Sequence, residues 1–239
     1  MSIDMMQTVG QLAAHVLGAT REFEKLGIDY CCGGNRSLGE ACVDAKLSVD
    51  QVLARLKGLA VAGPEPDRPW TNESLSGLIE HISNKHHVFI CEEGPHIQAS
   101  AAKVVGAHGQ NHPELLEAKQ IFDDLSNELS VHLMKEEQIL FPFVFRMEEA
   151  AAANEPAPLA MFGTVANPVR MMMQEHDGAG EALRKLRALT NNYAAPADAC
   201  ISYKALYDPL KGFEADLHQH IHLENNILFP RVIALEARQ

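Results

Sequence analysis

Two stretches of this sequence place a histidine and a glutamate four residues apart and then continue with almost the same letters. Residues 132–144 read HLMKEEQILFPFV and residues 220–232 read HIHLENNILFPRV, and seven of the thirteen positions are identical. Four residues make one helical turn plus about 40°, so a helix holds both side chains of such a pair on one face. Imidazole and carboxylate groups are metal ligands. The repeat therefore predicts a metal site built from both copies.

Apolar residues surround both histidines at helical spacing. They fall seven and three residues before each histidine and seven and eight residues after it: Leu125, Leu129, Ile139, Leu140, Phe213, Leu217, Ile227 and Leu228. This spacing puts them on the stripe that holds the histidines, so we expect His132, Glu136, His220 and Glu224 to point into a helical core. Burying a carboxylate there is costly unless the group is paired or bound to a metal. Two such pairs predict a cation.

The remaining ligands should come from two further helical stretches, QEHDGAG with His176 and NKHHVF with His86 and His87. His176 precedes His220 by 44 residues, while His87 precedes His132 by 45 and His86 by 46. Two matching hairpins therefore favour His87 as the ligand. His86 and His81 are expected behind the ligands or at the surface.

The predicted ligand set contains four imidazoles and two carboxylates: His87, His132, Glu136, His176, His220 and Glu224. It exceeds what one tetrahedral zinc ion takes and suits two metals bridged by carboxylates. Nitrogen and oxygen ligands without thiolate favour iron or manganese, and iron where oxygen, nitric oxide or electrons are handled. The alternative is a set of hydrogen-bonded core histidines. That explanation is adequate for one histidine but not for six residues matched across a duplication.

The elements that must position these ligands are predicted to be helices, because no sustained strand-like alternation occurs. Four long helical stretches are expected at about 71–106, 113–150, 168–191 and from 197 to the C-terminus, with a kink at Gly94–Pro95. Pro142 and Pro230, ten residues after the repeated histidines, predict a break or kink in the second and fourth. Long helices with short connections favour an up-down-up-down four-helix bundle over residues 71–239.

The first 57 residues predict a separate small helical domain. Short apolar-periodic segments fall at about 6–18, 20–26, 36–44 and 48–57, and GLAVAGPEPDRPW at 58–70 contains three prolines, as is typical of a linker. Between the second and third segments stands CCGGN.

The adjacent thiols of Cys31 and Cys32 could transfer metal, accept a nitrosyl group or be oxidised, if they are exposed and have thiolate character. They could also be small buried apolar residues. A mutual disulfide would require strained geometry. We expect Cys42 to be packed, Cys91 to lie in the core and Cys200 to be structural.

Overall composition excludes several classes of protein. A net charge of −12 argues against binding to nucleic acid or to an anionic membrane. No apolar run is long enough to span a membrane, and the N-terminus lacks the pattern of a secretory signal. Five cysteines without framework spacing indicate a reducing cytoplasm.

Several motifs together resemble a known family. The two HxxxE…ILFP copies, EHDGAG, HPEL and IEHI resemble hemerythrin-like di-iron proteins, and IDYCCGGNRSLGEAC at 28–42 narrows the resemblance to the iron–sulfur cluster repair di-iron proteins. The resemblance covers nearly the whole chain. It implies an all-α fold, a hemerythrin-like bundle after a small helical domain. It also implies two iron ions held by the six ligands and bridged by both carboxylates, with an oxo or hydroxo bridge.

The resemblance further implies repair of iron–sulfur clusters damaged by nitric oxide or oxidants, with Cys31 and Cys32 helping in the transfer. Partners would be iron–sulfur proteins with damaged clusters, and the small ligand would be nitric oxide or oxygen. Glu175, as a candidate catalytic group, and His108 are expected near the site because both recur in similar repair proteins. Gly180 stands where oxygen-carrying hemerythrins have a further histidine, which weakens an oxygen-carrier role.

The sequence leaves two other functions open. The centre could reduce nitric oxide to nitrous oxide as an enzyme, or bind oxygen or nitric oxide reversibly as a sensor. A purely structural bundle leaves two buried glutamates unexplained. Whether the protein donates iron, and whether it forms a homodimer, is also left open.

Overall fold

The structure is a computed structural model that describes residues 3–61 and 70–238. Those residues form helices joined by short connections and contain no β-strand, which confirms the predicted all-α fold class. None of the described helices is both long and apolar enough to cross a membrane. The chain divides into two compact units, one of Met1–Glu80, Val144–Ala166 and His218–Gln239 and one of His81–Phe143 and Asn167–Leu217.

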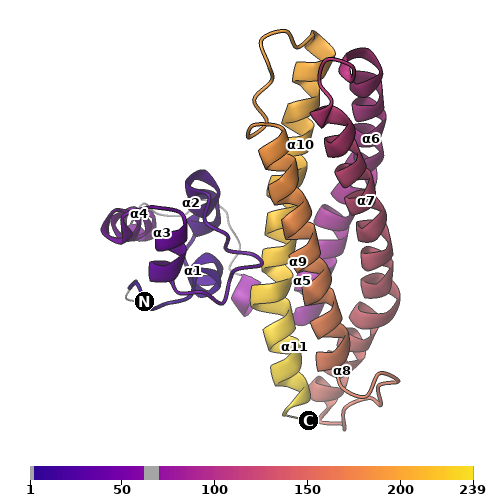
Figure 1. Ribbon diagram of the computed structural model, residues 1–239. Coiled ribbons are helices and arrows are strands. Elements are labelled where there is room, and N and C mark those ends of the chain that lie inside the picture. Colours follow the sequence, from indigo (N-terminus) through magenta and orange to yellow (C-terminus); the bar gives the residue numbers. More distant parts are fainter. Residues whose placement is uncertain (1–2, 62–69, 239) are drawn as a thin grey trace. The chain divides into compact units, whose positions relative to one another are not determined.

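The second unit is a four-helix bundle, as the sequence predicts. Its long helices lie side by side in Figure 1: α6 (Val88–His108), α7 (Glu114–Lys135), α9 (Ala166–Leu189) and α10 (Ile201–Leu223), whose last residues belong to the first unit. Phe213 of α10 packs against Phe122 of α7, with ring centroids 5.1 Å apart. Arg187 of α9 pairs with the buried Glu214 of α10 at 2.7 Å. A short π-helical turn, η2 (Ile82–His87), precedes α6.

The first unit begins with the predicted small helical domain. Its helices are α1 (Val9–His15), α2 (Ala19–Leu26), α3 (Leu38–Asp44) and α4 (Val49–Val61), packed around a core that includes Phe23, Leu38 and Leu56. Capping boxes start α1 and α3: the side chain of Thr8 pairs with Gln11, and that of Ser37 with Glu40. Four residues predicted as linker, 58–61, continue α4, and residues 62–69 lie outside the described part of the chain. Trp70 opens a 3₁₀ turn, η1 (Trp70–Asn72).

The remaining elements of the first unit are α5 (Leu75–His81), α8 (Phe141–Ala153), the π-helical turn η4 (Glu224–Leu228) and α11 (Phe229–Glu236). A third π-helical turn, η3 (Glu136–Leu140), lies in the second unit before α8. Arg231 of α11 donates hydrogen bonds to the carbonyls of Trp70, at 3.1 Å, and Glu73. Glu148 of α8 accepts the first two backbone N–H groups of α5.

Pro142 and Pro230 do not end the helical run, so of the two predicted alternatives, a break or a kink, the break is wrong. Each proline is the second residue after a π-helical turn, η3 in one copy and η4 in the other. A proline removes one N–H donor and crowds the carbonyl four residues earlier, and a wider turn accommodates both effects. Likewise, α6 continues through Pro95 as one helix.

The π-helical turns also change the face on which later residues lie. Ile139, predicted to be on the core stripe, is 53% exposed, while Ile227 at the matching position is buried. A π turn advances each residue by a smaller angle than an α turn, so the α-helical phase no longer holds after Glu136. In the second copy, α1 packs on η4 and covers it.

Candidate metal centre

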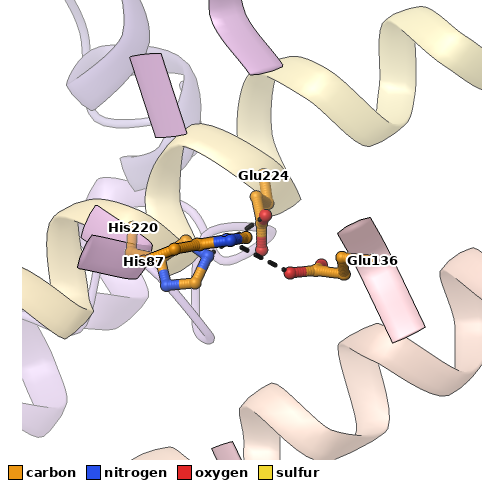
Figure 2. Close-up of side chains that lie close together, drawn as sticks. All are labelled: His87, Glu136, His220 and Glu224. Carbon is orange, nitrogen blue, oxygen red and sulfur yellow. Dashed lines mark ion pairs between the residues drawn. The ribbon is translucent and has the colours of Figure 1, made fainter. Parts of the chain in front are cut away.

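The six predicted ligands are all buried, none more than 2% exposed. They form two groups whose ligand atoms lie within 4.8 Å of one another: His87, Glu136, His220 and Glu224 in one, and His132, Glu136, His176 and Glu224 in the other. Figure 2 shows the first group, with both carboxylates facing the imidazole nitrogens. Glu136 and Glu224 belong to both groups. A carboxylate has two oxygens, so each of these glutamates could contribute a ligand atom to both groups.

The helices explain how these side chains meet. His132 and His220 lie in the last turns of α7 and α10, and each is followed after four residues by the glutamate that opens a π-helical turn. His87 ends the π-helical turn η2. His176 lies in α9 in phase with buried Met172 and Ala179, as its spacing predicts.

Distances between the donor atoms fit metal coordination. The Nε2 atoms of His132 and His176 are 3.1 Å apart, and Nε2 of His220 lies 3.1 Å from a Glu224 oxygen. Nε2 of His87 and of His132 lie 3.5 and 3.4 Å from the two oxygens of Glu136. Two donors about 2.1 Å from one ion and 90–110° apart are roughly 3.0–3.4 Å from each other. The donor set and its spacing therefore fit metal ions.

Carboxylates outside the cluster orient two of the histidines. His132 Nδ1 lies 2.8 Å from Glu175 Oε2, and His87 Nδ1 lies 2.8 Å from Glu137 Oε1. An ionised carboxylate can only accept a hydrogen bond, so Nδ1 carries the hydrogen and donates it, and Nε2 presents its lone pair to the cluster. Glu175 was expected near the site. Glu137 was not predicted to lie near the site, although its position directly after Glu136 could have suggested it.

Glu175 is itself held in the ionised form. Burial opposes its ionisation, but hydrogen bonds from Lys135 and His132 outweigh burial and keep the pKa of the carboxyl below its ordinary value. Lys135 was not singled out from the sequence, because only the folded chain brings α7 and α9 together there.

A pocket of about 590 Å³ opens beside the cluster. His132 and His176 form part of its lining, along with polar and apolar residues of α7 and α9 that include Leu125, Glu128, Leu129, Val131, Lys135 and Glu175. A small molecule can therefore approach two of the histidines from one side.

Three other positions considered in the sequence lie outside the two ligand groups. His86 is buried, and its Nδ1 lies 3.0 Å from both oxygens of Asp216, which places it behind the ligands, as expected. The prediction that His108 lies near the site is wrong. His108 ends α6, twenty-one residues after His87, or about 30 Å along the axis, and contacts Cys200. Gly180 is buried on α9.

The isolated cysteines differ partly from expectation. Cys42 is buried, as expected. Cys91 is exposed rather than in the core, because it points outward from α6. Cys200 is exposed just before α10, and its sulfur lies 3.0 Å from His108 Nε2.

The CCGGN segment forms a tight turn in the first unit. Cys31 is buried, Cys32 is half-buried, and their sulfurs are 3.9 Å apart without a disulfide. Neither belongs to the histidine and glutamate groups. Asn225 and Asn226, which directly follow Glu224 in η4, donate hydrogen bonds to the carbonyls of Cys31, at 3.3 Å, and Tyr30, at 3.0 Å. The sequence analysis did not predict these hydrogen bonds. The only signal for them was the sequence ENN, which begins four residues after His220.

Comparison with known proteins agrees with both parts of the chain. Residues 78–232 match the Hemerythrin HHE cation binding domain, and residues 5–60 match ScdA_N, described as a Domain of Unknown function (DUF542). The cation-binding match and the donor geometry both indicate a metal site at the histidine and glutamate cluster.

Two whole proteins are similar to this chain along nearly its full length. The chain is 39% identical to a "Probable iron-sulfur cluster repair protein" of Haemophilus influenzae, over 95% of this chain and 96% of that protein. It is 36% identical to the "Iron-sulfur cluster repair protein YtfE" of Escherichia coli O81, over 96% of this chain and 98% of that protein. With a hemerythrin-type cation-binding bundle after an ScdA_N domain, and with similarity along nearly its full length, the chain belongs to the family of iron–sulfur cluster repair proteins.

Proposed function

We propose that this protein acts in the cytoplasm to restore iron–sulfur clusters damaged by nitric oxide or oxidants, and that its metal site holds two iron ions. The observation that carries the proposal is the pair of overlapping ligand groups that share Glu136 and Glu224. One iron position would be served by His87 and His220, the other by His132 and His176. Nitrogen and oxygen donors without thiolate suit non-haem iron. The repair activity is the one that names the similar proteins.

The surrounding residues have defined tasks in this function. Bound iron would supply an exchangeable ferrous ion and redox chemistry. Glu175 and Glu137 keep Nδ1 of His132 and His87 protonated, so that Nε2 stays available. The apolar helices keep water from the buried carboxylates. Cys31 and Cys32 would assist transfer to a damaged iron–sulfur protein.

Reactivation of a damaged cluster enzyme tests the proposal. An enzyme with a nitric oxide-treated cluster is incubated with iron-loaded protein, with iron-free protein, or with ferrous iron alone. We expect recovery well above that given by ferrous iron alone only with iron-loaded protein. Glu136→Gln should abolish this advantage, and Glu149→Gln, at the surface of α8, should retain it. Equal recovery with and without iron-loaded protein would contradict the function.

A second candidate is reduction of nitric oxide, which the pocket beside His132 and His176 favours because it admits a small ligand. Two nitric oxide molecules, two electrons and two protons give nitrous oxide and water. Nitrous oxide is measured from iron-loaded protein with excess electron donor under anaerobic conditions. Many turnovers per chain would support catalysis, and a stable adduct without turnover would instead favour a sensor.

A further inference from the structure

A second group of metal-ligating side chains lies outside the histidine and glutamate cluster. Asp29, Cys31 and Cys32 each present one ligand atom, and these three atoms lie within 4.8 Å of one another. The two sulfurs are 3.9 Å apart, and Cys31 Sγ is 3.5 Å from Asp29 Oδ1.

These separations match the edges of a coordination tetrahedron. In that geometry two ligands are separated by about 1.6 times the metal–ligand distance. With a metal–sulfur distance of about 2.3 Å and a metal–oxygen distance of about 2.1 Å, the sulfur–sulfur edge is about 3.8 Å and the sulfur–oxygen edge about 3.6 Å. Both distances in the structure agree with these values to about 0.1 Å.

The backbone of the turn holds the carboxylate in place. Asp29 Oδ1 accepts the N–H groups of Cys32, at 3.0 Å, and Gly33, at 2.9 Å. A side chain at Gly33 would crowd this arrangement, because its Cβ would come 3.2 Å from Asp29 Cγ and 3.0 Å from the Asp29 carbonyl oxygen. Glycine therefore lets the chain turn closely enough to bring the three ligands together.

The composition of the turn suits a cation. The carboxylate of Asp29 and the two sulfurs lie close together, with Cys31 Sγ 3.5 Å from Asp29 Oδ1 and 3.9 Å from Cys32 Sγ. A bound cation would offset the negative charge of the carboxylate and of the thiolates that bind it. The alternative explanation of these distances is a set of hydrogen bonds from the Cys31 thiol to Asp29 and to Cys32, and a metal titration distinguishes the two explanations.

We propose that Asp29, Cys31 and Cys32 form a second metal site for a thiophilic divalent cation of the ferrous iron, zinc or cobalt type. Two thiolates and one carboxylate leave a fourth position for water or for a ligand of an acceptor protein. On binding, each thiol releases its proton to solvent, and the oxidation state of the metal does not change. The use of this site for iron transfer rests on the proposed function, whereas the site itself does not.

Its position in the fold suits a transfer role. The carbonyls of Tyr30 and Cys31 are hydrogen-bonded to Asn226 and Asn225 of η4, and Glu224 of the same turn belongs to the buried cluster. The second site is therefore attached to an element that carries a ligand of the first.

Cobalt titration of the iron-loaded full-length protein tests the site under anaerobic, reducing conditions. Thiolate bound to Co²⁺ gives intense near-ultraviolet charge-transfer absorption, which imidazole and carboxylate ligands do not give, so the buried cluster is silent in this assay. We expect one equivalent of Co²⁺ to develop the band. Cys32→Ser should reduce it by about half or more, and Cys31→Ser with Cys32→Ser should abolish it.

Two further variants keep the test decisive if Cys31→Ser weakens the fold. Asp29→Asn keeps an oxygen that accepts the two N–H groups, so the turn is retained, and we expect Co²⁺ affinity to fall at least about tenfold. Cys91→Ser, at an exposed thiol of α6, should change nothing. No charge-transfer band, or a band that survives loss of Cys31 and Cys32, would overturn the proposal.

The outcome is separable from that of the repair assay. A cobalt band without cluster reactivation would leave the site intact and contradict the proposed function. Reactivation by a protein that gives no cobalt band would contradict the second metal site and leave the proposed function intact.

Discussion

Hydrogen bonds donated by Nδ1 decide which nitrogen of His87 and His132 faces the buried carboxylates. Glu137 and Glu175 each accept from that atom at 2.8 Å, from positions directly next to a predicted ligand in the sequence. A negative partner also makes the imidazole more basic and a stronger metal ligand. Of the two, Glu175 is further fixed by Lys135.

We therefore expect Glu175→Gln to weaken metal binding about 10- to 100-fold while leaving the fold intact. A glutamine oxygen can still accept the hydrogen bond from Nδ1, but it carries no charge and cannot form an ion pair with Lys135. Competition with a coloured chelator measures the affinity. Glu117→Gln, at an exposed position on the same helix as His132, is the matched control. If both variants lose metal to the chelator at the same concentration as the unchanged protein, Glu175 has no part in metal binding.

The exposed thiols of Cys91 and Cys200 differ in their surroundings, so their reactivities should differ. The backbone N–H of Tyr203 and the imidazole of His108 lower the pKa of Cys200, whereas burial and the carboxylates of Glu137 and Glu92 raise that of Cys91. A lowered pKa keeps the reactive thiolate populated to lower pH. Alkylation by iodoacetamide, followed by peptide mass spectrometry, should modify Cys200 first at neutral pH.

The same experiment on His108→Gln supplies the control. Removing the imidazole should move the Cys200 alkylation profile toward higher pH and leave that of Cys91 unchanged. Equal rates for the two thiols in the unchanged protein would show that the helix start and His108 do not activate Cys200.

At the scale of elements, the helices were predictable and their local winding was not. Apolar spacing is a local property of the sequence, so it located every long helix to within a few residues. The π-helical turns depend on how a helix accommodates the proline after it, and this choice is made by packing around η3 and η4. The prediction that Ile139 is buried is wrong because it assumes one α-helical phase throughout. His132 and Glu136 come before the change of helical phase, and both are buried as predicted.

Asn226 of η4 fills the space between two glycines of the small helical domain, which gives a prediction about Gly10. A Cβ at Gly10 would overlap the Asn226 side chain and lie 2.9 Å from the Gly34 carbonyl oxygen. We expect Gly10→Ala to destabilise this contact by about 1–3 kcal/mol. Hydrogen exchange of α1 and of residues 28–34 should accelerate.

Gly58 is the matched control, because it lies in α4 and a methyl group added there would meet nothing within 4 Å. Gly58→Ala should leave exchange around the CCGGN turn unchanged and stabilise α4 by about 0.5–1 kcal/mol. Unchanged protection of α1 in Gly10→Ala would mean that Asn226 moves aside without loss.

At the scale of the whole molecule, the internal duplication made the histidine and glutamate cluster predictable. It matched His87 with His176 and each His–Glu pair with the other, without knowledge of any contact. The oriented carboxylates Glu137 and Glu175 and the link from Asn226 to Tyr30 could not be found this way, since they join positions far apart in sequence and have no counterpart in the other copy. The duplication predicts only the residues that both halves share. Contacts that differ between the two halves can be seen only in the tertiary structure.

Glu136 and Glu224 have no exposed surface, so metal removal should affect the stability of the protein. An ion that binds only the folded chain stabilises it by about 4 kcal/mol at a thousandfold excess over Kd. In a protein of this size each kcal/mol shifts the thermal midpoint by about 2–4 °C. We therefore expect chelation of iron to lower the midpoint, measured by far-ultraviolet circular dichroism, by about 8–16 °C.

The double variant Glu136→Gln and Glu224→Gln separates metal loss from general loosening of the helices. Neutral amides are less costly to bury than carboxylates without a cation, so the metal-free variant should melt at or above the midpoint of the metal-free unchanged protein. Chelator should have no effect on it. A variant that melts far below the metal-free protein would instead mean that the two carboxylates stabilise the helices through hydrogen bonds alone, and that the cation adds little to folding.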